Sequence, residues 1–148
     1  MSLDVYLKMP EALNFDWGKI FVRRDGQTIE ITRQEWDEEH PNEEPFTTTP
    51  SVSNVVYTAN ITHNLNTMAD VAGIYDALWR PEEIGIVKAR DLIAPLEKGL
   101  ELLRSDPVGF SKLNPSNGWG SYDVLVCFVG NYLDACRQFP DADVSVWR

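Results

Sequence analysis

Apolar and polar residues alternate at both ends of this chain, over residues 2–8 and again over 141–147. Period two is typical of a half-buried strand, because successive side chains of a strand point to opposite faces. The apolar faces consist of Leu3, Val5 and Leu7 in the first stretch and Val144 and Val146 in the second. Both ends are therefore predicted to be strands, and the sequence leaves open whether they are neighbours in one sheet.

A β-hairpin is predicted over residues 19–32, because Asp25-Gly26 is a strong two-residue turn signal. A type I′ turn needs positive φ at both central residues, and Asp followed by Gly tolerates this. The turn sets a register in which apolar residues face one another, in the pairs Val22–Ile29 and Ile20–Ile31. The agreement between the turn and these apolar pairs supports the hairpin.

The hairpin leads into an acidic segment. Thr32, followed by a glutamate three residues later, predicts a capping box at the start of a short helix. Residues 35–44 carry six acidic side chains and no basic one, and residues 45–54 are rich in Pro, Thr and Ser, which is typical of a loop or linker. We interpret 19–53 as a hairpin-plus-acidic-loop excursion from a single domain over 1–148, since about 35 residues are too few for a core of their own.

Three amphipathic helices are predicted after a β-rich run at residues 54–59. Each has apolar residues every three or four positions, which places them on one helical face. The three stripes are Leu65, Met68, Ala72, Tyr75 and Trp79; Ala89, Leu92, Ile93, Leu96, Leu100 and Leu103; and Leu125, Phe128, Val129, Tyr132 and Cys136. In the second helix, Pro95 predicts a kink or a restart. Gly99 indicates either a close helix contact or a glycine that the helix merely tolerates, at a cost of about 1 kcal/mol. Ser121 is the expected N-cap of the third helix.

Strands and helices are segregated along the chain, which defines the α+β class. We expect a small, mainly antiparallel sheet formed by the terminal strands and the β-hairpin, with three helices packed on one face. A chain of 148 residues, 43% of them hydrophobic, is long enough to bury the core of such a fold.

The charge of the chain narrows the classes of partner. Lys and Arg number 13 against 23 Asp and Glu, which gives a net charge of −10. This charge disfavours direct binding to nucleic acids and to anionic membranes. No run approaches the about 20 apolar residues of a membrane helix. The opening residues also lack the pattern of a secretory signal, so a cytoplasmic protein is expected.

Missing motifs argue against several kinds of site. The sequence holds neither a Walker-type phosphate loop nor the ligand spacing of a structural zinc site, so we expect neither a metal nor another cofactor. Cys127 and Cys136 lie on opposite faces of the third predicted helix, about 13.5 Å apart along its axis. That spacing excludes a disulfide between them, and both are expected to be buried free thiols in a reducing cytosol.

Polar residues gather where the run at 54–59 passes into the first predicted helix. Asn60, Thr62, His63 and Asn64 offer amides, a hydroxyl and an imidazole beside the free N–H groups of a helix N-terminus, which favour anions. Capping of the helix by Thr62 or Asn64 is the purely structural alternative. His63 is the one candidate catalytic residue, as a lone general base paired with a carboxylate.

A second polar cluster is the turn-rich loop at residues 114–122, which leads into the third predicted helix. Asn117 offers an amide there, Trp119 an aromatic platform between two glycines, and Tyr122 a further aromatic ring. The structural alternative is that Trp119 plugs the edge of the core. Arg80 is suited either to clamp a phosphate or carboxylate, or to neutralise the C-terminal end of the first helix.

The phrases ANITHN, LWRPEE and NGWG, read from these clusters, resemble segments of small bacteriophage and bacterial proteins without an established activity. The resemblance covers residues 54–147 and the opening strand, and it does not extend to 19–53. It implies a cytosolic accessory protein in a bacterial host cell, of the kind that blocks host defences by binding a partner or sequestering a nucleotide signal. No functional residue is carried over from it.

Three hypotheses of function follow. The first is a non-catalytic binding protein that holds a small anionic, nucleotide-like ligand between the start of the first helix and the loop at 117–122. The second is a protein-interaction module in which the acidic segment 19–53 contacts a basic protein partner. The third is a hydrolase or transferase with His63 as general base. The sequence does not determine the oligomeric state.

Overall fold

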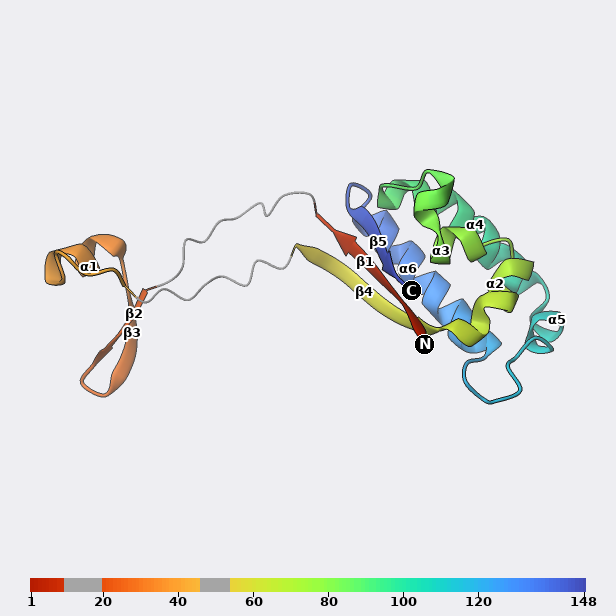
Figure 1. Ribbon diagram of the computed structural model, residues 1–148, viewed down its shortest axis with the longest axis horizontal. Helices are drawn as coiled ribbons and strands as arrows, with labels where there is room; N and C mark the ends of the chain where they lie inside the picture. The colour runs from red at the N-terminus through yellow and green to blue at the C-terminus, as the bar shows by residue number, and fades with distance from the viewer. Residues whose placement is uncertain (10–19, 46–53) are drawn as a thin grey trace. The chain divides into compact units, whose positions relative to one another are not determined.

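The structure, a computed structural model, describes residues 1–9, 20–45 and 54–148. These residues form two compact units, one made of 1–9 with 54–148 and the other of 20–45 (Figure 1). The smaller unit falls inside the 19–53 segment that is predicted to leave the main domain. The predicted linker lies outside the described residues over 46–53.

The larger unit is built on a three-stranded antiparallel sheet in the order β4-β1-β5. Its strands are β1 (Ser2–Lys8), β4 (Val55–Thr62) and β5 (Asp143–Trp147). The two terminal strands are neighbours, since Val5 of β1 pairs with Val146 of β5 on one side and with Ala59 of β4 on the other. Leu3, Val5 and Leu7 are 0% exposed, which confirms the predicted alternation.

The smaller unit contains the predicted hairpin, formed by β2 (Ile20–Arg24) and β3 (Gln27–Ile31). The register is the predicted one, with the pairs Val22–Ile29 and Ile20–Ile31. The turn residues have the positive φ that a type I′ turn needs, 51° at Asp25 and 76° at Gly26. The α+β class is confirmed, but the hairpin forms a two-stranded sheet of its own. The third strand of the main sheet is β4 instead.

The short helix α1 (Arg33–Glu39) follows the hairpin and begins with the predicted capping box. The Thr32 side chain accepts a hydrogen bond from the Glu35 N–H, and the Glu35 carboxylate accepts one from the Thr32 N–H. His40, which follows α1, is half-buried, because its ring stacks on Trp36 at a centroid distance of 4.1 Å.

The first predicted helix is divided in the structure, so a continuous helix there is wrong. The segment consists of η1 (His63–Leu65), α2 (Asn66–Val71), α3 (Tyr75–Trp79) and η2 (Pro81–Ile84). Gly73 has φ 76° and ends α2. The N–H groups of Gly73 and Ile74 donate to the carbonyls of Asp70 and Ala69, which is a Schellman ending. The apolar stripe survives the break, because Leu65, Met68, Ala72 and Trp79 remain buried.

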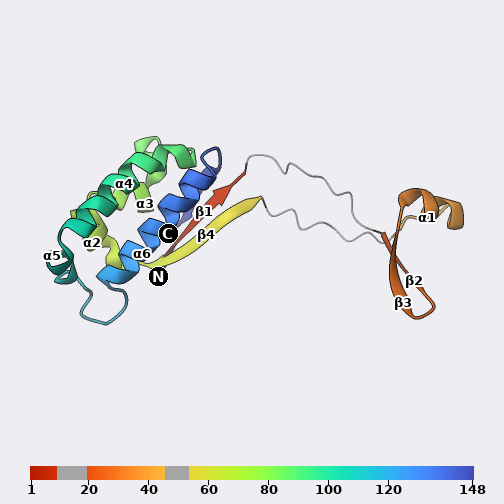
Figure 2. The ribbon, with the colours of Figure 1, turned by 180° about the vertical axis from the view of Figure 1, so that it is seen from behind.

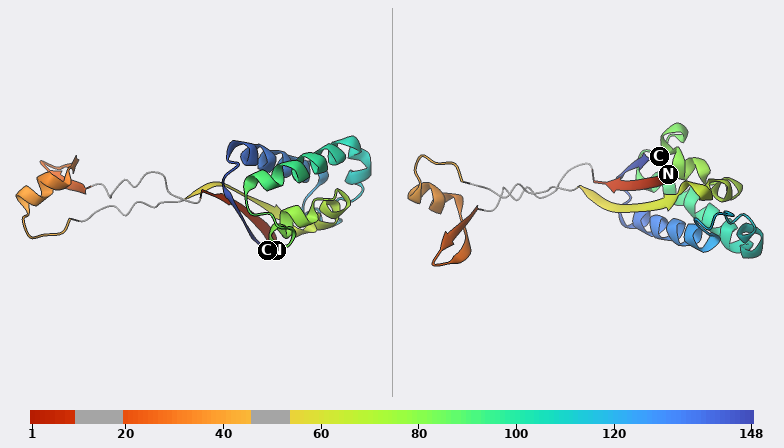
Figure 3. Two further views of the ribbon diagram at one scale, coloured as in Figure 1. Left: turned by 90° about the horizontal axis from the view of Figure 1, so that it is seen from above. Right: turned by 60° about the horizontal axis from the view of Figure 1, so that its bottom comes forward.

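The second and third predicted helices are confirmed as α4 (Ala89–Ser105) and α6 (Tyr122–Gln138), with the short α5 (Pro107–Ser111) between them. Pro95 does not restart α4, which is continuous through it. Ser121 caps α6, since its hydroxyl accepts a hydrogen bond from the Val124 N–H. Both long helices lie on the same side of the sheet (Figures 2 and 3).

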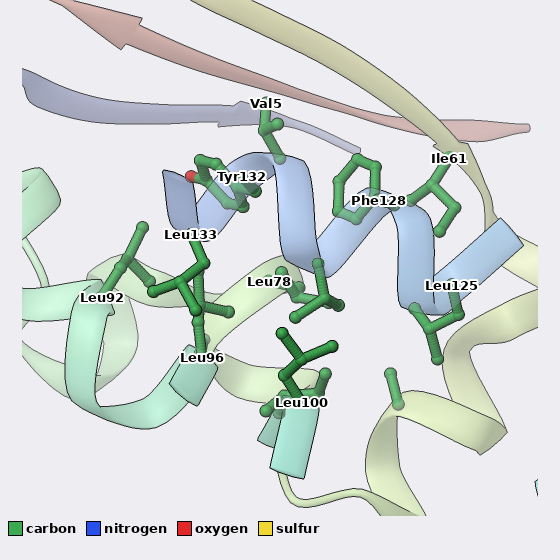
Figure 4. Close-up of a cluster of buried hydrophobic side chains, with 14 of the residues drawn as sticks. Val5, Ile61, Leu78, Leu92, Leu96, Leu100, Leu125, Phe128, Tyr132 and Leu133 are labelled. Carbon is green, nitrogen blue, oxygen red and sulfur yellow. The ribbon is translucent and has the colours of Figure 1, made fainter. Parts of the chain in front are cut away.

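The core of the larger unit lies between the sheet and these helices (Figure 4). Phe128 and Tyr132 of α6 lie toward the strands, where Tyr132 stacks with Tyr57 of β4 at 5.8 Å. On the other side of α6, Leu125 and Leu133 pack among buried leucines that include Leu92, Leu96 and Leu100 of α4. The helix α6 is therefore the middle layer between the sheet and α4.

Gly99 makes a close contact, which is the first of the two alternatives that the sequence indicates. A Cβ atom built on Gly99 would lie 2.1 Å from Cγ2 of Ile74, which precedes α3. We expect Gly99→Ala to lower the free energy of unfolding by about 1–2 kcal/mol. Overpacking costs about 1–3 kcal/mol, and the higher helix propensity of alanine offsets part of that cost. The matched control is Gly130 in α6, where a Cβ meets nothing within 4 Å. Gly130→Ala should raise stability in urea denaturation; equal effects of both variants would contradict the contact.

The two cysteines differ in exposure. Cys136 is buried, whereas Cys127 is exposed, so the expectation that both are buried is wrong for Cys127. Cys127 therefore lies on the part of the α6 surface that faces solvent. Burial raises the pKa of the Cys136 thiol to about 12.

A thiol reagent should therefore distinguish the two cysteines, because the thiolate is the reactive form. At pH 8 we expect one equivalent of a disulfide reagent to react with the native protein at Cys127, and a second only after denaturation. Cys127→Ser should remove the fast reaction. Rapid native labelling of Cys136 in that variant would contradict the burial seen here.

Candidate functional site

The two polar clusters that the sequence singles out meet in the larger unit. Asn60, Thr62 and Asn64, from the end of β4 and from η1, line one surface hollow with Asn117 and Trp119 of the loop before α6. Met1 and Ser2 complete the described lining, and the volume of the hollow is about 520 Å³. Five of the eight predicted binding residues thus share one site.

The β4 side of the hollow is held by the sheet and by a cap. Asn60 pairs with Asp4 of β1, and its amide Nδ2 donates a hydrogen bond to the Asp4 carboxylate. The Thr62 hydroxyl accepts hydrogen bonds from the backbone N–H and the side-chain Nδ2 of Asn64, at 3.3 and 3.1 Å. Thr62 therefore caps η1, as the structural alternative predicts, and its side chain also borders the hollow.

The opposite side of the hollow depends on Gly120. A Cβ atom at Gly120 would lie 2.8 Å from Cγ2 of Thr62 and 2.9 Å from Cγ of Leu65, and its φ is 98°. Only glycine combines this φ with such a close approach, so Gly120 allows the loop to lie against the corner between β4 and η1. Within the loop, the Asn117 side-chain oxygen accepts a hydrogen bond from the Trp119 N–H at 2.9 Å.

The lining of the hollow is polar but carries no charged side chain among its described residues. It offers the carboxamides of Asn60, Asn64 and Asn117, the hydroxyls of Ser2 and Thr62, and the indole of Trp119. The Trp119 side chain is 69% exposed, so it does not plug the core. A surface of this kind can stack a planar ring and form hydrogen bonds to its edge.

His63 does not belong to the lining. Its Nδ1 accepts a hydrogen bond of 3.0 Å from Nε1 of Trp79, which is 1% exposed. The lone pair of Nδ1 is therefore engaged, and the neutral ring carries its proton on Nε2. That Nε2 is buried without a hydrogen-bond partner among the described residues. This geometry serves the packing of Trp79, and it leaves no accessible lone pair for a general base.

Arg80 and Tyr122 also lie outside the lining. The Arg80 guanidinium donates to Oε1 of Glu83 at 2.7 Å. The Tyr122 hydroxyl donates to the carbonyl of Leu103 at 2.8 Å and thereby joins α6 to α4. Conversely, sequence analysis does not identify Met1 and Ser2 as lining residues. The signal that places them is the antiparallel pairing of Ser2 with Thr62, which only the assembled sheet reveals.

Two other kinds of site are not found in the part of the chain that the structure describes. No group of three or more His, Cys, Asp or Glu side chains is placed to hold a metal ion there. None of the described helices combines the length and apolar character needed to cross a membrane.

Comparisons with family models, with curated proteins and with solved structures found no match to this chain. The resemblance to small bacteriophage and bacterial proteins stays a prediction. Function is therefore inferred from the geometry of the described residues.

The bond between His63 and Trp79 yields a test of the role of His63. We expect a double-mutant cycle of His63→Leu and Trp79→Phe to show a coupling of about 1 kcal/mol in unfolding free energy, because each single change leaves the other partner without its hydrogen bond. A coupling near zero would contradict the bond.

His63→Leu should also leave ligand binding at the hollow unchanged. A loss of binding in a folded variant would show that His63 does belong to the binding site.

Proposed function

We propose that this protein is a non-catalytic binding protein whose hollow takes the nucleobase of a nucleoside or nucleotide. The observation that carries the proposal is the meeting of Trp119 with the carboxamides of Asn60, Asn64 and Asn117 around one hollow of about 520 Å³. Each cluster alone has a structural explanation. Together they combine an aromatic platform with donors and acceptors.

The platform suits a flat heteroaromatic ring. Trp119 is among the most exposed large apolar side chains described, with 69% of its surface accessible, and leaving it in water has a cost that a stacked ligand would remove. Stacking of a base on an aromatic side chain contributes about 1–3 kcal/mol. This contribution depends on the faces of the ring and not on its edge, so Trp119 would set affinity and the amides specificity.

The carboxamides retain hydrogen-bonding capacity after their internal bonds. Asn117 uses its oxygen for the Trp119 N–H, so its NH₂ group remains free to donate. Asn60 uses its Nδ2 for Asp4, so its oxygen remains as an acceptor. Asn64 keeps its oxygen and one N–H after donating to Thr62. Adjacent donors and acceptors of this kind match the edge of a base, as asparagine does with adenine in nucleic-acid complexes.

The charge of the lining side chains bears on which part of a nucleotide would bind most strongly. No cationic side chain lies among the described lining residues, Arg80 is paired with Glu83, and the Asp4 carboxylate adjoins Asn60. A phosphate would therefore find no arginine or lysine side chain among the described lining residues. We expect the uncharged base and sugar to provide most of the affinity, and the anionic part of the ligand to contribute little.

The lining also favours binding over turnover. Its hydroxyls, on Ser2 and Thr62, have no histidine beside them in the described lining, and a serine or threonine needs such a base to act as a nucleophile. Sequestration of an intact ligand is the function that this set of side chains supports best.

The experiment is a titration of the purified protein with adenosine, guanosine, cytidine and uridine, their monophosphates, and simple sugars, followed by calorimetry and tryptophan fluorescence. Trp119→Ala should weaken binding of the best nucleoside about tenfold or more, because it removes the stacking surface. Trp147→Ala is the matched control, since Trp147 in β5 is equally exposed, at 69%, and does not line the hollow.

Three outcomes would contradict the proposal. One is that no nucleoside binds, and another is that sugars bind and nucleosides do not. The third is that Trp147→Ala weakens binding as much as Trp119→Ala does. Recovery of a chemically altered nucleoside would show that the protein is an enzyme and not a sequestering protein.

A further inference from the structure

The two edges of the main sheet differ in whether other described residues cover them. On the β5 side, the segment before α4 covers the edge: the Val144 N–H donates to the carbonyl of Val87, and Lys88 forms a bridge and an ion pair with Asp143. On the β4 side, no described residue outside β1 makes a backbone hydrogen bond to residues 56–60. Figures 1 and 3 show β4 at this margin of the sheet.

The backbone groups at the β4 margin can be assigned. The His63 N–H donates to the carbonyl of Met1, which marks this pair as hydrogen-bonded in the β1–β4 ladder. Hydrogen-bonded pairs alternate along an antiparallel ladder, so Tyr57, Ala59 and Ile61 also bond to β1. The N–H and C=O groups of the intervening residues, Thr58, Asn60 and Thr62, therefore point away from the sheet. Val56 falls outside this alternation, because it is the unpaired residue of a β-bulge between the pairs Leu7–Tyr57 and Lys8–Val55.

This margin lacks the devices that protect an edge strand. Residues 57–62 contain no charged residue and no proline, and the described β1–β4 bulge, at Val56 opposite Leu7/Lys8, lies just before this stretch. Val, Tyr, Thr and Ile, the residues that favour strands, dominate the segment. An open, uncharged edge of this length is a template for another strand.

We propose that a second copy of this chain pairs with β4 through its own β4, antiparallel and centred on Thr58, so that two sheets become one six-stranded sheet. Two-fold symmetry makes every such pairing occur twice, as in other isologous dimers. With Thr58 opposite Thr58 of the second copy, the outward N–H and C=O groups of the two Thr58 residues pair with each other. Each Asn60 then lies opposite the bulge at Val56 of the other copy.

The side chains in this register are complementary on both faces. On the face away from the helices, the two Thr58 side chains meet, a pair that favours strand association. On the helix face, the large Tyr57 faces the small Ala59. Since β4 carries no charge, two chains of net charge −10 meet here without placing like charges opposite each other.

Part of the solvent-facing surface of α6 also carries uncharged side chains. Cys127 and Val124 are exposed on α6, the latter at 47%. The pKa of the Tyr57 hydroxyl is raised by burial first and then by the thiols of Cys136 and Cys127.

The experiment measures molar mass by sedimentation and light scattering from about 1 µM to about 1 mM, a range that detects weak dimers. We expect a concentration-dependent dimer for the unchanged chain. Thr58→Lys and Thr58→Glu should each weaken dimerisation about tenfold or more, because each places like charges opposite each other. An equimolar mixture of the two variants should restore the dimer, since Lys then faces Glu.

The matched control is Ser145→Lys. Tyr6 pairs with both Thr58 and Ser145, so the two positions lie in one row of the sheet and differ in their edge. Ser145→Lys should leave the dimer unchanged, and circular dichroism and urea denaturation should show all variants folded. A monomeric unchanged chain, Thr58 variants that still dimerise, or a mixture that fails to restore the dimer would each overturn this pairing. None of these readouts involves the ligand, so they are independent of the proposed function.

Discussion

β1 lies between β4 and β5, and the rest of the larger unit depends on this double pairing. It joins the first residues of the chain to residues 55–62 on one side and to the last residues on the other. The apolar face of β1 is completely buried and forms the surface on which α6 packs, with α4 behind it. In the described sheet β4 and β5 have no strand partner other than β1, so removal of β1 would leave both without a ladder.

The hollow follows from the same pairing and from one close backbone approach. The pairing of Ser2 with Thr62 places the first residues beside the end of β4. Gly120 then brings the loop before α6 within contact of Thr62 and Leu65, so Asn117 and Trp119 face the β4 residues. Two segments separated by more than 50 residues thus provide one neutral, hydrogen-bonding surface with an aromatic platform. The absence of charged side chains from that described lining favours a base or a nucleoside over a phosphate.

The elements that sequence analysis predicts well are those whose local signals agree. For α6, a buried stripe coincides with the N-cap Ser121, and for α4 the stripe alone predicts the helix. For the hairpin, the turn residues and the apolar pairs indicate one register. The first predicted helix is wrong because periodicity continues across Gly73. A Schellman ending there redirects the chain while it keeps Ala72 and Trp79 facing the core, so the apolar pattern carries no trace of the break.

The sequence by itself determined which side chains are available and which face of each element is apolar, because both follow from residue identity and spacing. Only the tertiary structure decided how those side chains are used. Trp79, which is 16 residues from His63 in the sequence, donates a hydrogen bond to Nδ1 of His63 and so holds this histidine outside the candidate site. Glu83 does the same to Arg80, while the sheet adds Ser2 to the lining. Such partners are distant in sequence or set by strand register, and contacts of this kind form only when the core has assembled.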